Sequence, residues 1–396
     1  MADAAGKGIR SQNLALLLRL VCDSSPVTRV ELAKLAGLTK VTVTNLMAEL
    51  IDNGLVHDLG VTQHGGPGRP ASRVAPDPLG PVGIGFQVEV DHVAGCVVDL
   101  SGRIRRRELR RMDTRSLSPA EVVRGARPVL RRLFDHATTS GQLVAGIGVA
   151  LPALFGRDRD GQLLVRSVPG LGWQDVDVRT LVAGELEAIG ALGIDVRLGG
   201  SVPFAADVEC RGSAEDLIYV GGEAEVGAAL VTGGVPHAGA VGAFGHVPVH
   251  PRRGRCPCGR SGCLELSAGR AAMASAVGEP ETALPRLLSG KEPFAERLHD
   301  GDRRAATATT LAARALADAL AAPVAMLGPA TVVLGGRLAA LGDALREPLA
   351  GRLAEQHPGP RVRIGQGRPD TALQGAAWSV LAEIVDDPLG WLDRTS

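Results

Sequence analysis

Three closely spaced cysteines constrain the folding of this chain more than any other feature of its sequence. Cys256, Cys258 and Cys263 lie within the stretch RCPCGRSGCLEL, whereas the other three of the six cysteines are scattered through apolar segments. Thiols gathered so tightly on one loop are able to share a metal ion, because thiolate is a preferred ligand of borderline and soft metals. The sequence therefore predicts a compact metal-binding loop, and it leaves open whether the metal reacts or only braces the fold.

The length and charge of the chain limit the classes of protein to which it can belong. Its 396 residues and formal net charge of zero leave room for two or three domains, and they exclude binding to nucleic acid through overall charge alone. The N-terminal segment has no signal-peptide pattern, and no apolar run reaches the roughly 18 residues of a membrane span. We expect a cytoplasmic protein with no membrane partner, whose thiols stay reduced.

Helix signals dominate the N-terminal part of the chain. Thr28 followed by Glu31 forms a capping box, and Gly37 ends the short helix that begins there. Thr39 caps a second helix, which stops at Gly54. The apolar residues of this second helix recur at helical spacing and form one stripe, made of Val43, Leu46, Met47 and Leu50. Two helices joined by a tight turn containing glycine predict a helix-turn-helix.

The opposite face of the second helix suits contact with DNA. Short polar side chains and one cation gather near its N-terminus, namely Lys40, Thr42, Thr44 and Asn45. Such side chains hydrogen-bond to base edges without blocking the approach of a helix to the major groove. The alternative interpretation is a plain helical domain with a solvated polar face.

Two strand-like segments around a Gly/Pro-rich tip follow these helices and predict a wing. Arg69 lies at the tip in GPGRP, where the flanking prolines favour extended backbone. An arginine placed there can enter a minor groove or contact a phosphate. Residues 1–75 hold eight Lys/Arg and six Asp/Glu, a net charge of only +2. Tight binding to double-stranded DNA would therefore require a homodimer or homotetramer to multiply the contacts.

Beyond the wing, strand-like and helix-like segments alternate to the end of the chain, which predicts α/β architecture. We expect a winged helix-turn-helix in residues 1–78, a first α/β lobe in 79–200 and a second in 201–396. The sequence leaves open whether the C-terminal helix packs against the second lobe or returns to the first. Within the second lobe, DLIYVGGEAEVGAALVTGGV predicts a strand pair with its tight turn at Gly233 and Gly234.

Several phrases occur in a fixed order: a helix-turn-helix with a GRP wing, VVDLSG, GIGVALPALF, GHVPV, CPCGRSGCLEL and VVLGG. Together they resemble the ROK family of bacterial repressors and sugar kinases, which includes N-acetylglucosamine and xylose repressors. The resemblance covers nearly the whole chain, and the cysteine run with its upstream Gly-His is its most specific part. It implies a two-lobed, actin-like ATPase fold of the ROK sugar kinase type with a sugar cleft between the lobes. In the regulator branch, a winged helix-turn-helix precedes this fold.

The resemblance also supplies a fourth ligand for the cysteine loop. His246 lies ten residues before Cys256, so that the loop spans residues 246–265. Three thiolates from Cys256, Cys258 and Cys263 with one imidazole suit a closed tetrahedral Zn²⁺ site, which has no open position for catalysis. His250 is a rival ligand on the same loop, and free thiols beside a chance histidine are the alternative to a metal site.

The residues that phosphoryl transfer would need are altered. The family's Asn-Asp pair is matched by a glycine and Ser201, and a serine hydroxyl cannot act as a general base near neutral pH. The phosphate loop Asp-x-Gly-Gly-Thr reads QVEVD here, so that Glu89 and Val90 replace its glycines. The second phosphate turn carries Glu223 and Glu225, which would repel a triphosphate. We expect a protein that is not an enzyme.

The sugar pocket that the resemblance implies is altered as well. The family's Gly-Glu-x-Gly-His reads GAFGH, so that Ala243 stands where a carboxylate would bind a hydroxyl. His246 and Glu265 remain as ligand-binding candidates, although Glu265 is equally well explained as a solvated or helix-capping carboxylate. Losing most hydroxyl partners weakens discrimination among sugars.

These observations predict a DNA-binding transcriptional regulator, a repressor, with a catalytically degenerate sensor domain related to sugar kinases. Its expected partners are a double-stranded DNA operator and a small, sugar-like effector, and its cofactor is Zn²⁺. One alternative is an active sugar kinase with an appended DNA-binding head. Another is a DNA-binding scaffold that responds to no ligand.

Overall fold

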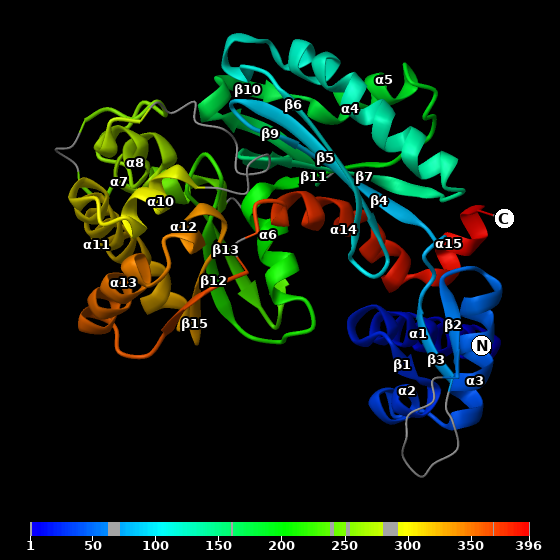
Figure 1. Cartoon of the computed structure of the whole chain (residues 1–396). Coiled ribbons are helices and arrows are strands. Elements are labelled where there is room, and N and C mark those ends of the chain that lie inside the picture. Colours follow the sequence, from blue (N-terminus) through cyan, green and yellow to red (C-terminus); the bar gives the residue numbers. More distant parts are fainter. Residues whose placement is uncertain are drawn as a thin grey trace.

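An N-terminal head precedes two α/β lobes in the computed structural model, which describes residues 2–61, 72–159, 161–237, 241–250, 254–279, 292–366 and 368–395 (Figure 1). The described part of the head holds helices and a small sheet with strand order β1-β3-β2. Its elements are α1 (Ala2–Ser24), β1 (Val27–Thr28), α2 (Arg29–Ala36), α3 (Lys40–Asp52), β2 (Val56–Val61) and β3 (Ser72–Pro76).

The predicted caps set the ends of α2 and α3. Thr28 accepts a hydrogen bond from the N–H of Glu31 and completes the capping box, and Gly37 ends α2 with φ of +67°. The side chain of Thr39 accepts from the N–H of Thr42 at the start of α3. The four residues of the predicted apolar stripe are all buried, namely Val43, Leu46, Met47 and Leu50. The local predictions for α2 and α3 are therefore confirmed.

The first lobe is built on a five-stranded sheet with the order β11-β7-β4-β5-β6. Strand β4 pairs antiparallel with β5 and parallel with β7, and β7 pairs parallel with β11 at the edge. The strands are β4 (Val82–Val88), β5 (His92–Asp99), β6 (Ile104–Arg111), β7 (Val144–Leu151) and β11 (Val196–Gly200), and the covering helices are α4 (Pro119–Thr139) and α5 (Val178–Glu187). A small sheet beside this one contains β8 (Leu154–Arg157), β9 (Leu163–Val168) and β10 (Trp173–Val176).

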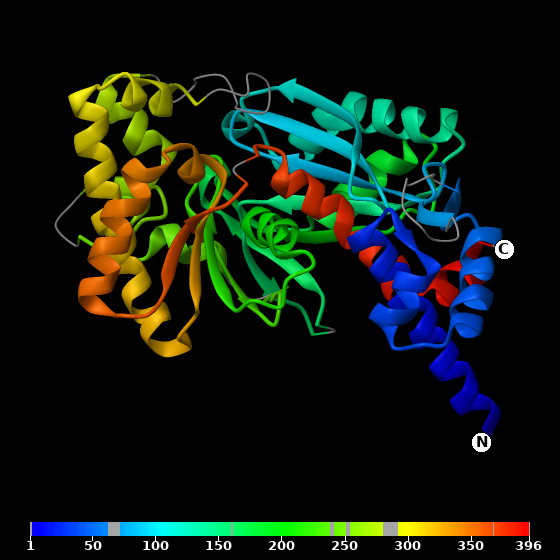
Figure 2. The ribbon, with the colours of Figure 1, turned by 60° about the horizontal axis from the view of Figure 1, so that its bottom comes forward.

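A late helix, α14 (Thr371–Asp386), returns from the second lobe and packs on the face of the first sheet that α4 and α5 leave open (Figures 1 and 2). Glycines on the sheet permit this close approach. A Cβ at Gly83, Gly85 or Gly148 would lie 2.2, 2.1 or 1.9 Å from a backbone oxygen of α14. No side chain can occupy these positions unless the helix shifts, so the glycines fix the position of α14.

The second lobe contains a sheet with the order β14-β13-β12-β15-β16. Its strands are β12 (Leu217–Gly221), β13 (Gly227–Thr232), β14 (Val235–Pro236), β15 (Thr331–Leu334) and β16 (Arg361–Ile364). The predicted tight turn at Gly233 and Gly234 is confirmed, because Thr232 pairs with Val235 across it. This turn joins β13 to β14, whereas the longer turn between β12 and β13 begins after Gly221 and passes through Gly222, with φ of +137°.

Helices cover the second sheet and connect it to the first. Helix α6 (Ser201–Cys210) follows β11 directly and packs against both β13 and α14. The other helices of this lobe are α7 (Glu265–Ala268), α8 (Arg270–Val277), α10 (Pro293–His299), α11 (Arg303–Leu327), α12 (Gly336–Ala340) and α13 (Asp343–Gln356). Among the described residues, α11 alone is long and apolar enough to cross a membrane, but it belongs to the core, where it packs against α7, α8 and α13.

The head and the first lobe share one hydrophobic core. This core joins Leu14, Leu18 and Met47 of the head to Leu381 of α14 and to Cys96 of β5. Helix α1 also packs against α14 and against the final helix, α15 (Pro388–Thr395). Protein interiors are close-packed and transmit strain. A shift of α14 would therefore displace the side chains of the head that pack against it.

Candidate ligand cleft and metal centre

One histidine and three cysteines converge at the loop that the sequence singles out. The ligand atoms of His246, Cys256, Cys258 and Cys263 all lie within 4.8 Å of one another. Nδ1 of His246 is 3.5 Å from Sγ of Cys256, and the Sγ atoms of Cys258 and Cys263 are 3.6 Å apart. His250 lies on the same loop but is not part of this cluster.

The spacing of these atoms fits a tetrahedral metal centre. With metal–sulfur bonds of about 2.3 Å and metal–nitrogen bonds of about 2.0–2.1 Å, a tetrahedron places two sulfurs about 3.8 Å apart and a sulfur about 3.5 Å from a nitrogen. Glycines allow the loop to wrap this tightly, because Gly259 and Gly262 adopt φ values of +87° and +71°. The donor set and the geometry therefore fit Zn²⁺.

Glu265 begins α7 immediately after the cluster. Its Oε2 accepts a hydrogen bond of 2.8 Å from the N–H of Val226, which lies in the turn between β12 and β13. Neighbouring Glu225 accepts a hydrogen bond from the N–H of Gly170 in the first lobe, and burial together with the nearby Glu265 raises the pKa of Glu225 to about 8. At neutral pH the carboxyl group of Glu225 is mostly protonated, so it joins the two lobes without a buried charge.

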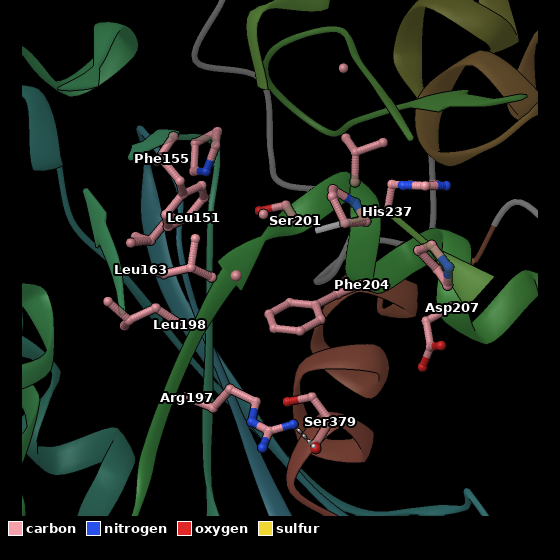
Figure 3. Close-up of a pocket in the computed structure, with 18 of the residues that line it drawn as sticks. Leu151, Phe155, Leu163, Arg197, Leu198, Ser201, Phe204, Asp207, His237 and Ser379 are labelled. Atoms are coloured by element: carbon pink, nitrogen blue, oxygen red, sulfur yellow. Dashed lines mark hydrogen bonds between the residues drawn. The ribbon is translucent and has the colours of Figure 1, made fainter. Parts of the chain in front are cut away.

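A cavity of ≈ 730 Å³ lies between the lobes and extends along β11 and α6 (Figure 3). Ser201, at the start of α6, is 8% exposed and lines the cavity, and its Oγ has no hydrogen-bond partner in the described part of the chain. Asp207 lines the same cavity from further along α6, and Figure 3 shows it well apart from Ser201. Neither His246 nor Glu265 lines this cavity, and His246 borders a separate space of ≈ 180 Å³ beside Ala243. Ligand binding by His246 and Glu265 stays a prediction.

The stretch QVEVD forms contacts across the cleft. Asp91 accepts hydrogen bonds of 2.9 Å from Arg270, the first residue of α8, and of 2.7 Å from Nδ1 of His92. Glu89 is 2% exposed, accepts a hydrogen bond of 2.7 Å from Gln87, and has its pKa raised to about 7 by burial. The side chains of this stretch are therefore held by hydrogen bonds to one another and to Arg270. Sequence reasoning missed Arg270, because nothing near it in sequence indicates that it crosses to the first lobe.

The polar residues predicted for the head lie at the start of α3. Lys40, Thr44 and Asn45 are exposed, and Thr42 is half-buried. The hydroxyl of Thr44 donates to the carbonyl oxygen of Lys40, and that of Thr42 lies 2.9 Å from the hydroxyl of Thr39. The wing arginine, Arg69, lies outside the described residues.

Helix α6 connects the cleft to α14, the helix that packs against α1 of the head. It begins at Ser201 in the cavity and ends next to Arg211, whose guanidinium carbon lies 3.7 Å from the ring centroid of Trp378 on α14. Burial raises the pKa of Asp23, near the end of α1, and the nearby charge of Arg211 opposes this shift. A displacement of α6 by a ligand would therefore reach α14 and α1 through packed side chains.

Known structures define the class of the fold. The chain is similar to a ROK family glucokinase from Streptomyces griseus in complex with glucose and AMPPNP, with a TM-score of 0.60, 22% identity, and coverage of 75% of this chain and 98% of the kinase. It is also similar to a ROK family transcriptional regulator described as a homologue of the E. coli MLC protein, with a TM-score of 0.72, 20% identity, and coverage of 97% and 98% of the two chains. The fold is therefore that of the two-lobed sugar kinases.

The chain belongs to the ROK family, because the model of that family matches residues 83–383. Curated relatives include the xylose repressor of Bacillus subtilis, 25% identical over 70% of each chain. They also include the DNA-binding transcriptional repressor Mlc of Escherichia coli, which is 26% identical over 88% of this chain and 86% of its own length.

Proposed function

We propose that this protein is a DNA-binding transcriptional repressor whose kinase-derived lobes sense a ligand without transferring a phosphoryl group. The observation that carries the proposal is the exposed polar start of α3. Lys40, Thr44 and Asn45 project from the head on a helix whose other side is fully buried. Base-reading helices present such side chains at their N-terminal end.

The arrangement of the head supports this assignment. Helices α2 and α3 with the β2–β3 hairpin match a winged helix-turn-helix, in which α3 enters the major groove. Arg69, in the segment between β2 and β3, would contact the backbone or the minor groove of the DNA. The kinase and the regulator cover 75% and 97% of this chain, a difference close to the size of the head.

The names of the relatives support both the DNA partner and the effector. Repressors named for xylose and for N-acetylglucosamine are similar to this chain over most of its length. We infer a double-stranded operator as the target and a small, sugar-like or cyclic molecule as the effector. A homodimer or homotetramer in the cytoplasm would place two heads on successive half-sites and compensate for the weak positive charge of each head.

The cleft would control the heads through α6 and α14. A ligand shifts the balance between an open and a closed cleft only as far as its affinity for the two states differs. The Asp91–Arg270 ion pair joins the two lobes next to the stretch that corresponds to the family's phosphate loop. Opening of the cleft must therefore break this ion pair. Movement of α6 would then pass through the Arg211–Trp378 contact to the core shared with α1.

Loss of phosphoryl transfer is part of the same proposal. Ser201 cannot replace a carboxylate base, and Glu89, Val90 and Glu223 occupy the turns that would hold a triphosphate. The four residues of the metal cluster would hold Zn²⁺ in a closed shell, where it supplies cross-linking of the loop and no reaction. The cluster would thereby hold Glu265 and the β12–β13 turn at the cleft.

A mobility-shift assay with the region upstream of the protein's own gene tests the proposal. Asn45→Ala should weaken binding by roughly 5- to 150-fold if its amide reads a base, the equivalent of about 1–3 kcal/mol. Lys40→Ala should weaken binding to all sequences, whereas Arg303→Ala in the second lobe serves as the control. Equal mobility shifts for all variants would refute the assignment of α3, and titration with sugars, amino sugars and sugar phosphates would show whether an effector releases the DNA.

A further inference from the structure

The cavity beside Ser201 is larger and more apolar than a free sugar requires. Its volume of ≈ 730 Å³ lies within the range of roughly 300–1,000 Å³ found for pockets that hold drug-sized ligands. Apolar side chains line much of its wall, namely Leu151, Phe155, Leu163, Leu198, Val202 and Phe204. Polar side chains also line the cavity, among them Arg197, Asp207 and His237. A hexose carries hydroxyl groups all around its ring, and those that face the apolar part of the wall would be left without partners.

Two aromatic rings give the cavity a preference for a flat ligand. The ring of Phe204 lies against the backbone of β11, because a Cβ at Gly199 would come within 2.3 Å of the ring. Figure 3 shows Phe204 facing Leu163 and Leu198 across the cavity, with Phe155 at one end. Only six phenylalanines occur in the chain, and two of them line this cavity. Aromatic side chains stack or meet edge to face with a ligand ring.

Two buried polar groups in the cavity wall lack partners within the described part of the chain. They are Oγ of Ser201, on a residue that is 8% exposed, and Oε2 of Glu89, on a residue that is 2% exposed. An unsatisfied buried polar group costs about 1–3 kcal/mol. A hydroxyl group both donates and accepts, so a single ligand hydroxyl can satisfy the serine or the carboxyl group.

We propose that this cavity binds a flat aromatic molecule that carries a hydroxyl group. The ring lies between Phe204 and the leucines of β7, β9 and β11, and the hydroxyl group hydrogen-bonds to Oγ of Ser201. As the identity of the effector, this assignment rests on the proposed function, but binding in the cavity does not require DNA and is measured separately from it.

Titration calorimetry of the full chain with matched probes tests the assignment. 4-Hydroxyacetophenone should bind about fivefold more tightly than acetophenone, because one neutral hydrogen bond contributes about 1 kcal/mol. D-Glucose, D-xylose and N-acetyl-D-glucosamine should give no saturable heat in the same concentration range. Ser201→Ala should abolish the difference between the two phenones, and Ser275→Ala on the exposed face of α8 should leave it unchanged.

A second variant keeps the test valid if Ser201→Ala folds poorly. Leu163 is only half-buried, so Leu163→Trp can fill the cavity from its edge, and it should abolish binding of both phenones while leaving the melting temperature within a few degrees. A sugar that binds more tightly than 4-hydroxyacetophenone would overturn the assignment, as would an unchanged ratio in Ser201→Ala. DNA binding without phenone binding would leave the proposed function intact, and phenone binding without DNA binding would leave only this inference.

Discussion

Replacing Cys258 by serine should release the metal and destabilise the second lobe. Cys258 contributes one of the four ligand atoms, 3.6 Å from Sγ of Cys263, and a serine hydroxyl is a poor ligand for zinc. At free zinc 1,000-fold above the dissociation constant, bound metal stabilises the fold by about 4 kcal/mol. Losing this stabilisation should lower the melting temperature by roughly 8–16 °C for a unit of about 200 residues. Elemental analysis should find one zinc per wild-type chain and none in Cys258→Ser.

Matched substitutions separate the metal site from general effects. His246→Ala should lose zinc as Cys258→Ser does, whereas His250→Ala should keep it, because His250 lies outside the cluster. Cys22→Ser removes a thiol far from the loop and should also retain the metal. Wild-type protein purified without zinc, or Cys258→Ser that still holds one equivalent with unchanged melting, would refute the assignment.

Three further predictions follow from the cleft and the wing. ADP release from Mg-ATP with hexoses should stay at background, and Ser201→Asp alone should not raise it, because Glu89 and Val90 still fill the phosphate loop; turnover by either protein would revive the kinase alternative. The folded state binds a proton at Glu225, with a pKa raised to about 8, more tightly than the unfolded state does. The free energy of unfolding should therefore fall by up to about 1.4 kcal/mol per pH unit as pH rises from about 5 to 8, and Glu225→Gln should flatten this slope in urea titrations. Arg69→Ala should reduce affinity most for sites with A/T-rich flanks, and an equal loss on all flanks would show that Arg69 contacts only phosphate.

Local signals in the sequence predicted the helices of the head and the clustering of the three cysteines well. The helix caps at Thr28, Gly37 and Thr39 depend on hydrogen bonds and backbone angles within a few residues. Their positions can therefore be predicted from the sequence. The cysteine loop is also local, and only its fourth ligand, His246, required the family resemblance.

Long-range contacts could not be predicted in the same way. The Asp91–Arg270 ion pair joins residues that are 179 positions apart. The glycines of β4 and β7 are required only because α14 packs directly on them, and this contact cannot be predicted from the strands alone. The family resemblance predicts ligand binding at His246 and Glu265, which stays a prediction. The cavity beside Ser201 is lined by residues of β7, β8, β9, β11, α6 and the turn between β12 and β13, which no single segment of sequence brings together.

The affinity of the full chain for its own upstream region, relative to random DNA of equal length, tests the central claim most directly. Fluorescence anisotropy at one fixed, near-physiological salt concentration gives both dissociation constants. A sequence-specific repressor should bind its operator at least roughly 1,000-fold more tightly than random DNA. Equal affinity for the operator and for random DNA across the tested upstream fragments would contradict the claim that this chain is a repressor.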